Sequence, residues 1–168
     1  MIIKQVIGNT ATLLLNGLTI DRLELEWFET TKRIQRKTTA GGMEIAIRFL
    51  REGQRLLQHD VLYMDEQKAV VVHIKPCDAI VVSPQSLLQM GTICYEIGNK
   101  HLPLFIQDDQ VLIPFEEPLF RWLLASGYEP VKAERQLVNM LKSNVEPHEH
   151  NGGGTSLFTK IINLASKQ

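Results

Sequence analysis

The histidines are the residues of this chain whose chemistry is easiest to assign, because imidazole nitrogen is a common ligand of transition metals. His101 follows a stretch, residues 90–97, in which apolar side chains recur at helical spacing, and Gly98 interrupts that pattern. The sequence therefore predicts a helix with Gly98 at its C′ position and His101 just beyond its end. The C-terminus of a helix carries unpaired carbonyl groups and a partial negative charge, which favour a bound cation. His101 is accordingly a candidate metal ligand, and a capping or packed histidine is the alternative.

A metal at His101 needs further ligands, since one imidazole supplies a single nitrogen. His148 and His150 are candidates, because they stand beside carboxylates in a segment that three glycines, residues 152–154, keep mobile. We expect this arm to lend ligands to a fixed anchor at His101, and a second copy of the chain is another source of imidazole. For His148 and His150 the alternative is a solvated tail without a binding role.

The composition bounds the class of protein. The chain has 168 residues, of which 44% are hydrophobic, so it can bury a substantial core as one or two domains. The net charge of -1 gives no global field that would favour nucleic acid or an anionic membrane as the main partner. The N-terminus lacks a signal-peptide pattern, and no stretch approaches the ~20 apolar residues of a membrane span, so we expect a soluble, cytoplasmic protein. Cys77 and Cys94 fit reduced thiols.

The sequence contains no recognisable catalytic motif. We find no glycine-rich phosphate loop, no nucleophile-elbow pattern and no His-Glu-x-x-His pair. Asp108 and Asp109 are adjacent on an expected loop tip, where a solvated turn is more common than an acid–base pair. We therefore expect a binding protein rather than an enzyme.

Residues 1–75 predict an all-β domain. Short β-like runs are separated by polar or glycine-containing turns, and residues 23–27 alternate apolar and acidic side chains as a half-buried strand does. Residues 39–42 are typical of a hairpin connection, since they end in Gly41 and Gly42.

Residues 76–141 predict strands that alternate with helices in the order βαββαβ, which is the ferredoxin-like arrangement. Residues 79–82 form a buried strand, and Ser83 and Pro84 are expected to start the first helix as its N-cap and first helical position. A hairpin turns at residues 107–110, a second helix runs from Glu116 or Glu117 to residues 126–127, and a last strand covers residues 131–137. The apolar stripe expected to face the core in the first helix comprises Leu87, Met90, Ile93, Cys94 and Ile97. The overall prediction is an α+β protein that ends in a flexible, histidine-containing tail, residues 142–168.

The segment Glu96-Ile97-Gly98-Asn99-Lys100-His101 also resembles the most specific signature of the UreE family, the nickel metallochaperones that serve urease assembly. Residues 23–30, 33–37, 44–48 and 60–63 resemble the same family, and the resemblance extends to about Leu141. In that family the histidine that closes the signature anchors the metal, which implies this role for His101. Family members end in tails with variable numbers of histidines, and His148 and His150 are similar to these.

This resemblance implies a homodimer that delivers Ni(II) to the urease apoprotein during metallocentre assembly, with the two copies of His101 near the two-fold axis. It also implies an all-β domain that binds partners or peptides, a ferredoxin-like domain that binds metal and dimerises, and accessory partners that include the GTPase UreG. Some relatives carry further histidines shortly after the anchor, but residues 110–117 contain none here. Imidazole suits Ni(II), Cu(II) and Zn(II) alike, so the choice of nickel comes from the resemblance.

Two other classes of function stay open from the residues alone. The first is a metal-independent adaptor, in which the β domain grips a protein segment and the second domain only dimerises. The second is a factor associated with RNA or the ribosome. A basic surface with exposed aromatic side chains would favour that second class, and the nearly neutral composition does not indicate one.

Overall fold

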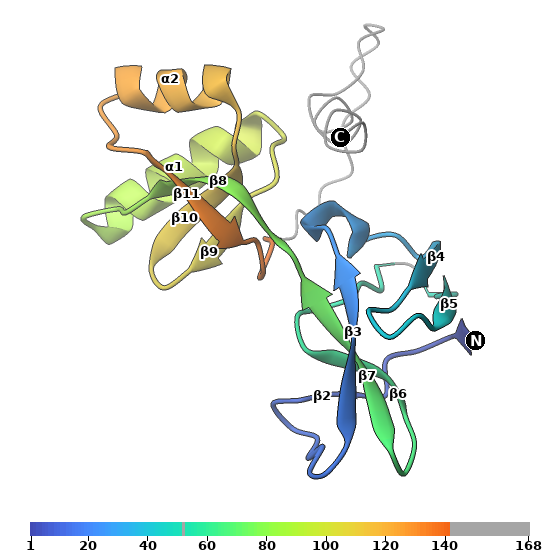
Figure 1. Cartoon of the computed structure of the whole chain (residues 1–168). Helices are drawn as coiled ribbons and strands as arrows, with labels where there is room; N and C mark the ends of the chain where they lie inside the picture. The colour runs from blue at the N-terminus through green and yellow to red at the C-terminus, as the bar shows by residue number, and fades with distance from the viewer. Residues whose placement is uncertain (52, 142–168) are drawn as a thin grey trace, which may run out of the picture. The chain divides into compact units, whose positions relative to one another are not determined.

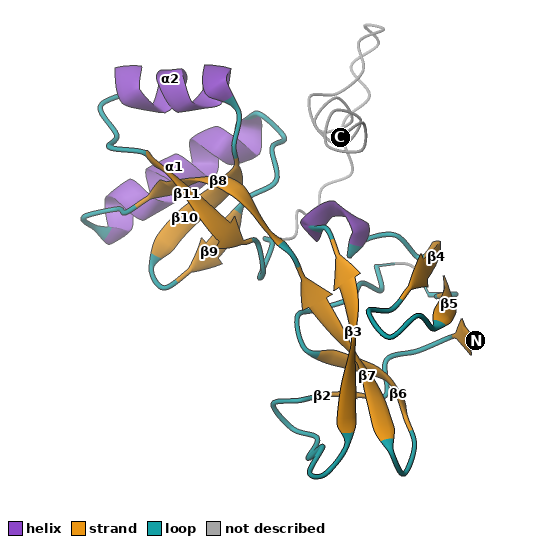
Figure 2. Cartoon of the chain, viewed as in Figure 1, coloured by secondary structure: helices purple, strands orange, loops and turns teal. Residues whose placement is uncertain are grey.

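The computed structural model describes residues 1–51 and 53–141, and the chain divides into two compact units, Met1–Pro76 and Cys77–Gln168 (Figure 1). The first unit is built from β-strands, and the second contains a sheet with two α-helices (Figure 2). The predicted α+β fold class is confirmed by this content. The predicted tail, residues 142–168, lies outside the described residues together with His148 and His150.

The first unit contains two sheets of mixed strand direction. The larger sheet has the order β2-β6-β7-β3 and comprises β2 (Gly8–Asn9), β6 (Asp60–Met64), β7 (Lys68–Ile74) and β3 (Thr19–Leu25). The smaller sheet has the order β1-β5-β4 and comprises β1 (Ile2–Ile3), β5 (Glu44–Arg48) and β4 (Ile34–Thr38).

Alternation of side chains explains these strands. In β3 the apolar residues Leu23 and Leu25 are fully buried, whereas Arg22 before them and Glu24 between them are exposed, as the sequence predicts for a half-buried strand. The predicted hairpin between β4 and β5 is also confirmed. Its loop requires glycine, because Gly42 has a φ of 86° and a Cβ at position 41 would lie 2.9 Å from the Asp21 carboxylate, which accepts the Gly41 backbone N–H.

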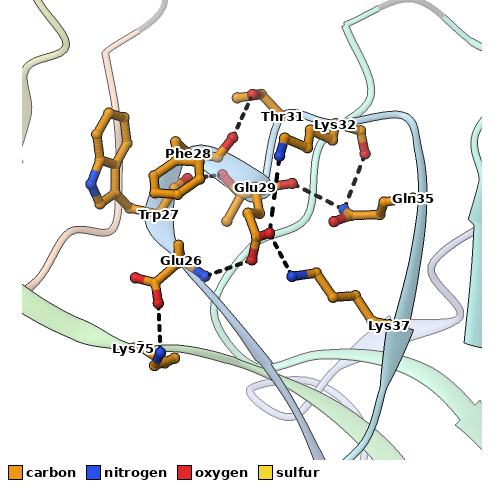
Figure 3. Close-up of polar contacts among 10 residues, drawn as sticks. Glu26, Trp27, Phe28, Glu29, Thr31, Lys32, Gln35, Lys37 and Lys75 are labelled. Carbon is orange, nitrogen blue, oxygen red and sulfur yellow. Dashed lines mark hydrogen bonds and ion pairs between the residues drawn. The ribbon is translucent and has the colours of Figure 1, made fainter. Parts of the chain in front are cut away.

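A short 3-10 helix, η1 (Trp27–Glu29), follows β3 and turns the chain toward β4 (Figure 3). The Glu29 carboxylate accepts a hydrogen bond from the Glu26 backbone N–H at 3.1 Å and pairs with the Lys37 ammonium. Glu26 pairs in turn with Lys75, and the Trp27 and Phe28 rings pack edge to face with their centroids 5.5 Å apart. The contacts drawn in Figure 3 thus join Glu26, Glu29 and their partners around two buried aromatic rings, whereas the Gln35 Oε1 atom is buried without a hydrogen-bond partner among the described residues.

The second unit has the predicted ferredoxin-like element order. It comprises β8 (Pro76–Val82), α1 (Leu87–Asn99), β9 (Phe105–Gln107), β10 (Gln110–Pro114), α2 (Glu117–Ala125) and β11 (Val131–Gln136). The sheet order β11-β8-β10-β9 places the first and third strands in the middle. One core joins both helices to the sheet, with Ile93 and Ile97 from α1, Leu119 and Leu123 from α2, and Ile80 from β8.

Two connections of this unit agree with the sequence. Asp108 and Asp109 both have positive φ, 49° and 59°, which is the backbone of a two-residue hairpin turn between β9 and β10. Helix α2 has Glu116 as its N-cap and ends at Ser126, followed by Gly127 with a φ of 82°. Among the helices in the described ranges, none combines the length and the apolar content needed to cross a lipid bilayer.

The predicted start of α1 is wrong. Ser83 and Pro84 precede the helix, and Ser86 is the N-cap, since its hydroxyl oxygen accepts the backbone N–H of Gln89 at 3.1 Å. The prediction that Leu87 belongs to the core is also wrong, because its side chain is 88% exposed. At 3.6 residues per turn, Leu87 points about 100° away from the direction shared by Ile93 and Ile97.

Candidate metal centre

The C-terminal end of α1 is closed by a Schellman motif in which His101 occupies the C′ position. Lys100 is the C-cap, and the backbone N–H of His101 donates to the Gly98 carbonyl at 2.9 Å. The N–H of Leu102 donates to the Ile97 carbonyl at 3.4 Å, and both side chains belong to the apolar core. The prediction that Gly98 occupies the C′ position is therefore wrong. Gly98 is helical, and His101 itself makes the reversal.

His101 adopts a backbone conformation that L-residues usually avoid. Its φ is 54°, in the left-handed region where a side chain costs roughly 1–2 kcal/mol relative to glycine. Histidine tolerates this region better than most residues, but glycine is the usual choice at C′. A non-glycine residue held at such a position is an outlier that motivates a functional hypothesis.

The imidazole of His101 is exposed and makes no hydrogen bond or ion pair with any residue that the structure describes. Two charged side chains near the end of α1, Lys100 and Glu96, are engaged by other residues. The Lys100 ammonium lies over the Trp122 ring, 4.3 Å from the ring centroid, and Glu96 accepts a hydrogen bond from the Tyr128 hydroxyl at 3.3 Å. The cation of Lys100 is thereby engaged by an aromatic face, and the imidazole is available to an external ligand.

Within residues 1–51 and 53–141, no group of three or more His, Cys, Asp or Glu side chains is arranged to hold a metal ion. The other two described histidines, His59 and His73, belong to the first unit. The sequence-predicted ligands His148 and His150 lie outside the described residues, so the structure does not place them relative to His101. The described part of one chain thus presents His101 as an isolated ligand.

The two cysteines do not extend this site. Both are reduced thiols, as the sequence predicts. Cys94 is half-buried on α1, where its sulfur lies 3.9 Å from that of Met90. Burial raises the pKa of the Cys94 thiol, which disfavours the thiolate that binds metals.

Helix α1 also presents an apolar surface on the side away from the sheet, which the sequence reasoning missed. Leu87, Leu88 and Tyr95 are 88%, 81% and 71% exposed, and they line a surface depression together with Gly91 and Thr92. The spacing of Leu88, Gly91 and Tyr95 was the available signal, because residues three and four apart share a helix face. This α1 outer face, defined by these five residues, ends about two helical turns before His101.

Comparison with known proteins covers nearly the whole chain. Residues 3–75 match the family model described as the N-terminal domain of UreE urease accessory protein, and residues 77–155 match the model of its C-terminal domain. The urease accessory protein UreE of Flavobacterium johnsoniae is 57% identical over 165 residues, which are 98% of this chain and 99% of the relative.

More distant relatives carry the same description. The urease accessory protein UreE of Haemophilus influenzae is 44% identical over 147 residues, covering 85% of this chain and 80% of the relative. The urease accessory protein UreE of Acetivibrio thermocellus is 39% identical over 150 residues, which are 89% of this chain and 97% of the relative. The two domain models and these identities show that the chain belongs to the UreE family of urease accessory proteins.

Proposed function

We propose that this member of the UreE family is a nickel metallochaperone that carries Ni(II) to the urease apoprotein during metallocentre assembly. It acts without catalysis of its own, as a cytoplasmic homodimer, and hands the metal over together with accessory proteins that include the GTPase UreG. The family membership supports the role in urease maturation, and the geometry at the end of α1 supports the metal site.

The observation that carries the proposal is the conformation of His101. A glycine would adopt the φ of 54° without steric cost, yet the position holds an exposed imidazole with no partner among the described residues. Imidazole is a suitable ligand for Ni(II), and the negative end of the α1 dipole favours a cation beside it. A structural histidine would be expected to bond to its surroundings or to pack.

The α1 outer face supports the homodimer. Exposed apolar side chains gathered on one helix face mark an interaction surface, and Gly91 at its centre lets a second helix approach closely. Two-fold symmetry then supplies a second imidazole from the partner copy, which an isolated His101 requires. The tail residues His148 and His150 complete the coordination as exchangeable ligands, so that the metal can be released.

Geometry restricts how the two copies of α1 can meet. Gly91 and His101 are separated by about 15 Å along the helix at 1.5 Å per residue. Helices that crossed antiparallel at Gly91 would hold the two imidazoles about 30 Å apart, too far to share one ion. The dimer must therefore bring the C-terminal ends of the two α1 helices together.

Equilibrium dialysis against Ni(II), paired with a mass measurement in solution, tests the proposal. We expect a dimer that binds one tight Ni(II) per two chains. His101→Ala should abolish this tight binding while the dimer persists. The matched control is His59→Ala, because His59 is also exposed and also has a positive φ, 69°, but lies in the first unit. This variant should bind nickel as the wild type does.

The same measurement separates the proposal from its main alternative, a metal-independent adaptor. Tight binding that survives His101→Ala would remove the anchor role, and the absence of tight Ni(II) binding in the wild type would favour the adaptor. Parallel dialysis against Zn(II) and Cu(II) shows which metals compete for the same site, since the Irving–Williams order alone favours copper.

A further inference from the structure

Strand β4 forms an edge of the smaller sheet in the first unit, because the strand order is β1-β5-β4 (Figure 2). An edge strand presents unpaired backbone groups that can pair with another extended chain. The side chains and backbone groups of β4 can be assigned to the two sides of the strand from its register with β5. That assignment shows what kind of chain the edge can accept.

The hydrogen bonds at the two ends of the hairpin fix the direction of the backbone groups. The Phe49 N–H donates to the Arg33 carbonyl at 2.8 Å, and the Thr39 N–H donates to the Met43 carbonyl at 2.9 Å. In an antiparallel pair such bonded residues alternate with non-bonded ones. The N–H and C=O groups of Ile34, Arg36 and Thr38 therefore point away from β5, toward the free edge.

The two faces of β4 differ in how their side chains are used. On the inner face the Gln35 amide donates to the Glu29 and Lys32 carbonyls, and Lys37 pairs with the Glu29 carboxylate (Figure 3). On the outer face Ile34 is 77% exposed, and Arg36 is exposed as well. The inner face contributes to the fold of the unit, whereas the outer face has no such role.

Arg48 of β5 joins Arg36 on the outer face. Ile34 pairs with Arg48 and Arg36 pairs with Ala46, so Arg36 and Arg48 are diagonal neighbours on this face. No carboxylate in the described residues forms an ion pair with either arginine, and Glu44, on the other diagonal of Arg36, pairs with neither. Two adjacent like charges repel each other, and a carboxylate placed between them would relieve that repulsion through bidentate hydrogen bonds.

We propose that the edge of β4 binds an extended acidic segment of a partner protein, which adds to the sheet as a further strand. The outward N–H and C=O groups of Ile34, Arg36 and Thr38 pair with its backbone, and its carboxylates lie beside Arg36 and Arg48. An apolar side chain of the segment covers Ile34. A nucleic acid fits this face less well, because the outer positions of β4 and β5 carry no aromatic side chain for stacking.

Fluorescence anisotropy with labelled peptides tests this proposal. The full-length protein is used without metal and in its own oligomeric state, so the result does not depend on nickel binding. The probe is an octapeptide of alternating glutamate and valine with blocked ends. Its controls are the same peptide with lysine in place of glutamate, the same peptide with N-methylated backbone amides, and an oligouridine of equal length. We expect saturable binding of the acidic peptide that weakens with salt, and much weaker binding of the three controls.

Protein variants separate the side-chain and backbone contributions. The double variant Arg36→Ala, Arg48→Ala should weaken binding by about tenfold or more, since it removes two charge-assisted contacts. Arg135→Ala should not, although Arg135 is also an exposed arginine on an edge strand, β11. Thr38→Pro should also weaken binding, because it removes an outward N–H without breaking a bond to β5.

Three results would overturn the proposal. The first is a failure of the acidic peptide to bind, which would leave the arginines as charges that merely protect the edge from aggregation. The second is equal affinity of the wild type and the double arginine variant. The third is tighter binding of oligouridine than of the peptide, which would identify the face as a nucleic-acid surface.

Discussion

The corner formed by η1 and its flanking residues, 26–30, and the C-terminal end of α1 each change the direction of the chain with a short motif. They differ in which polar side chains have hydrogen-bond partners. At the corner, Glu29 bonds to the Glu26 N–H and pairs with Lys37. At the end of α1, the backbone groups close on themselves while the imidazole of His101 finds no partner in the described residues. A corner that satisfies its own polar groups contributes to stability, and an end that does not is suited to an external ligand.

Backbone conformation sharpens this contrast. Glu26 and Thr30, which flank η1, have φ values of -70° and -62° that any residue adopts. His101 has a φ of 54°. Mutations at the corner should therefore lower the stability without affecting nickel binding, whereas mutations of His101 should abolish tight nickel binding without lowering the stability.

The largest effect is expected where the end of α1 depends on the second copy of the chain. Leu88→Asp places a charge in the apolar α1 outer face and should weaken dimerisation by about 100-fold or more. Tight nickel binding should fall with it although His101 is intact, because the second imidazole is lost. Sedimentation and nickel dialysis measure the two effects, and Leu124→Asp on α2, which replaces another exposed leucine, is the control. A Leu88→Asp dimer with unchanged nickel binding would place the interface elsewhere.

The next largest effect belongs to the corner. Glu29→Ala removes the acceptor of the Glu26 N–H and leaves Lys37, which is 27% exposed, without its carboxylate. We expect a loss of about 2–3 kcal/mol in the free energy of unfolding, measured by urea denaturation. The matched control Glu117→Ala removes the exposed i,i+4 pair with Arg121 and should cost only about 0.3–0.5 kcal/mol.

Nickel affinity should be the same in both of these variants and in the wild type. A Glu29→Ala protein that is as stable as Glu117→Ala would show that the corner network contributes little. A loss of nickel binding in Glu29→Ala would contradict the separation between the two regions.

A smaller effect should appear at His101 itself, with the opposite sign. His101→Gly relieves the left-handed strain but adds freedom to the unfolded chain, so we expect a net gain of about 0.5–1 kcal/mol in the free energy of unfolding. His101→Ala keeps a Cβ and should show no such gain. Both variants lose the tight nickel site, so bound metal does not contribute to the difference between them. Urea denaturation without metal and at equal protein concentration therefore measures how the backbone conformation at position 101 affects the free energy of unfolding. Equal stability of His101→Gly and the wild type would mean that the strain is absorbed elsewhere.

Local sequence signals predicted the parts of the fold that local chemistry determines. Two adjacent aspartates tolerate positive φ, so the turn at Asp108 and Asp109 could be read directly. The start of α1 could not, because Ser83-Pro84 and Ser86 are both good helix starts. The bond from Gln89 N–H to Ser86 decides between them in the folded chain.

The sequence predicted the position of His101 in the candidate site, but not the backbone that holds it or the α1 outer face. The sequence placed His101 after the helix but assigned the reversal to Gly98, because glycine is the residue that usually adopts positive φ. The sequence did not predict the α1 outer face. Helix α1 has apolar residues on two sides, one in the core and one exposed, and the sequence alone does not show which is which. Burial of Ile93 and exposure of Leu88 distinguish the two stripes, and both depend on where the sheet lies.

The smallest expected effect concerns the proposed tail ligands. Imidazole binds a metal only when it is neutral, so protons compete with Ni(II) and acid should release the metal. If His148 and His150 join the two copies of His101, more than one proton displaces each ion, and nickel affinity should fall steeply from mildly alkaline to mildly acidic pH. The double variant His148→Ala, His150→Ala should keep the anchor but show a shallower slope and a modest, several-fold loss of affinity at neutral pH. Isothermal titration calorimetry across this pH range gives both quantities. Identical slopes in the two proteins would make His148 and His150 spectators, and an affinity independent of pH would argue against histidine ligation at the end of α1 as well.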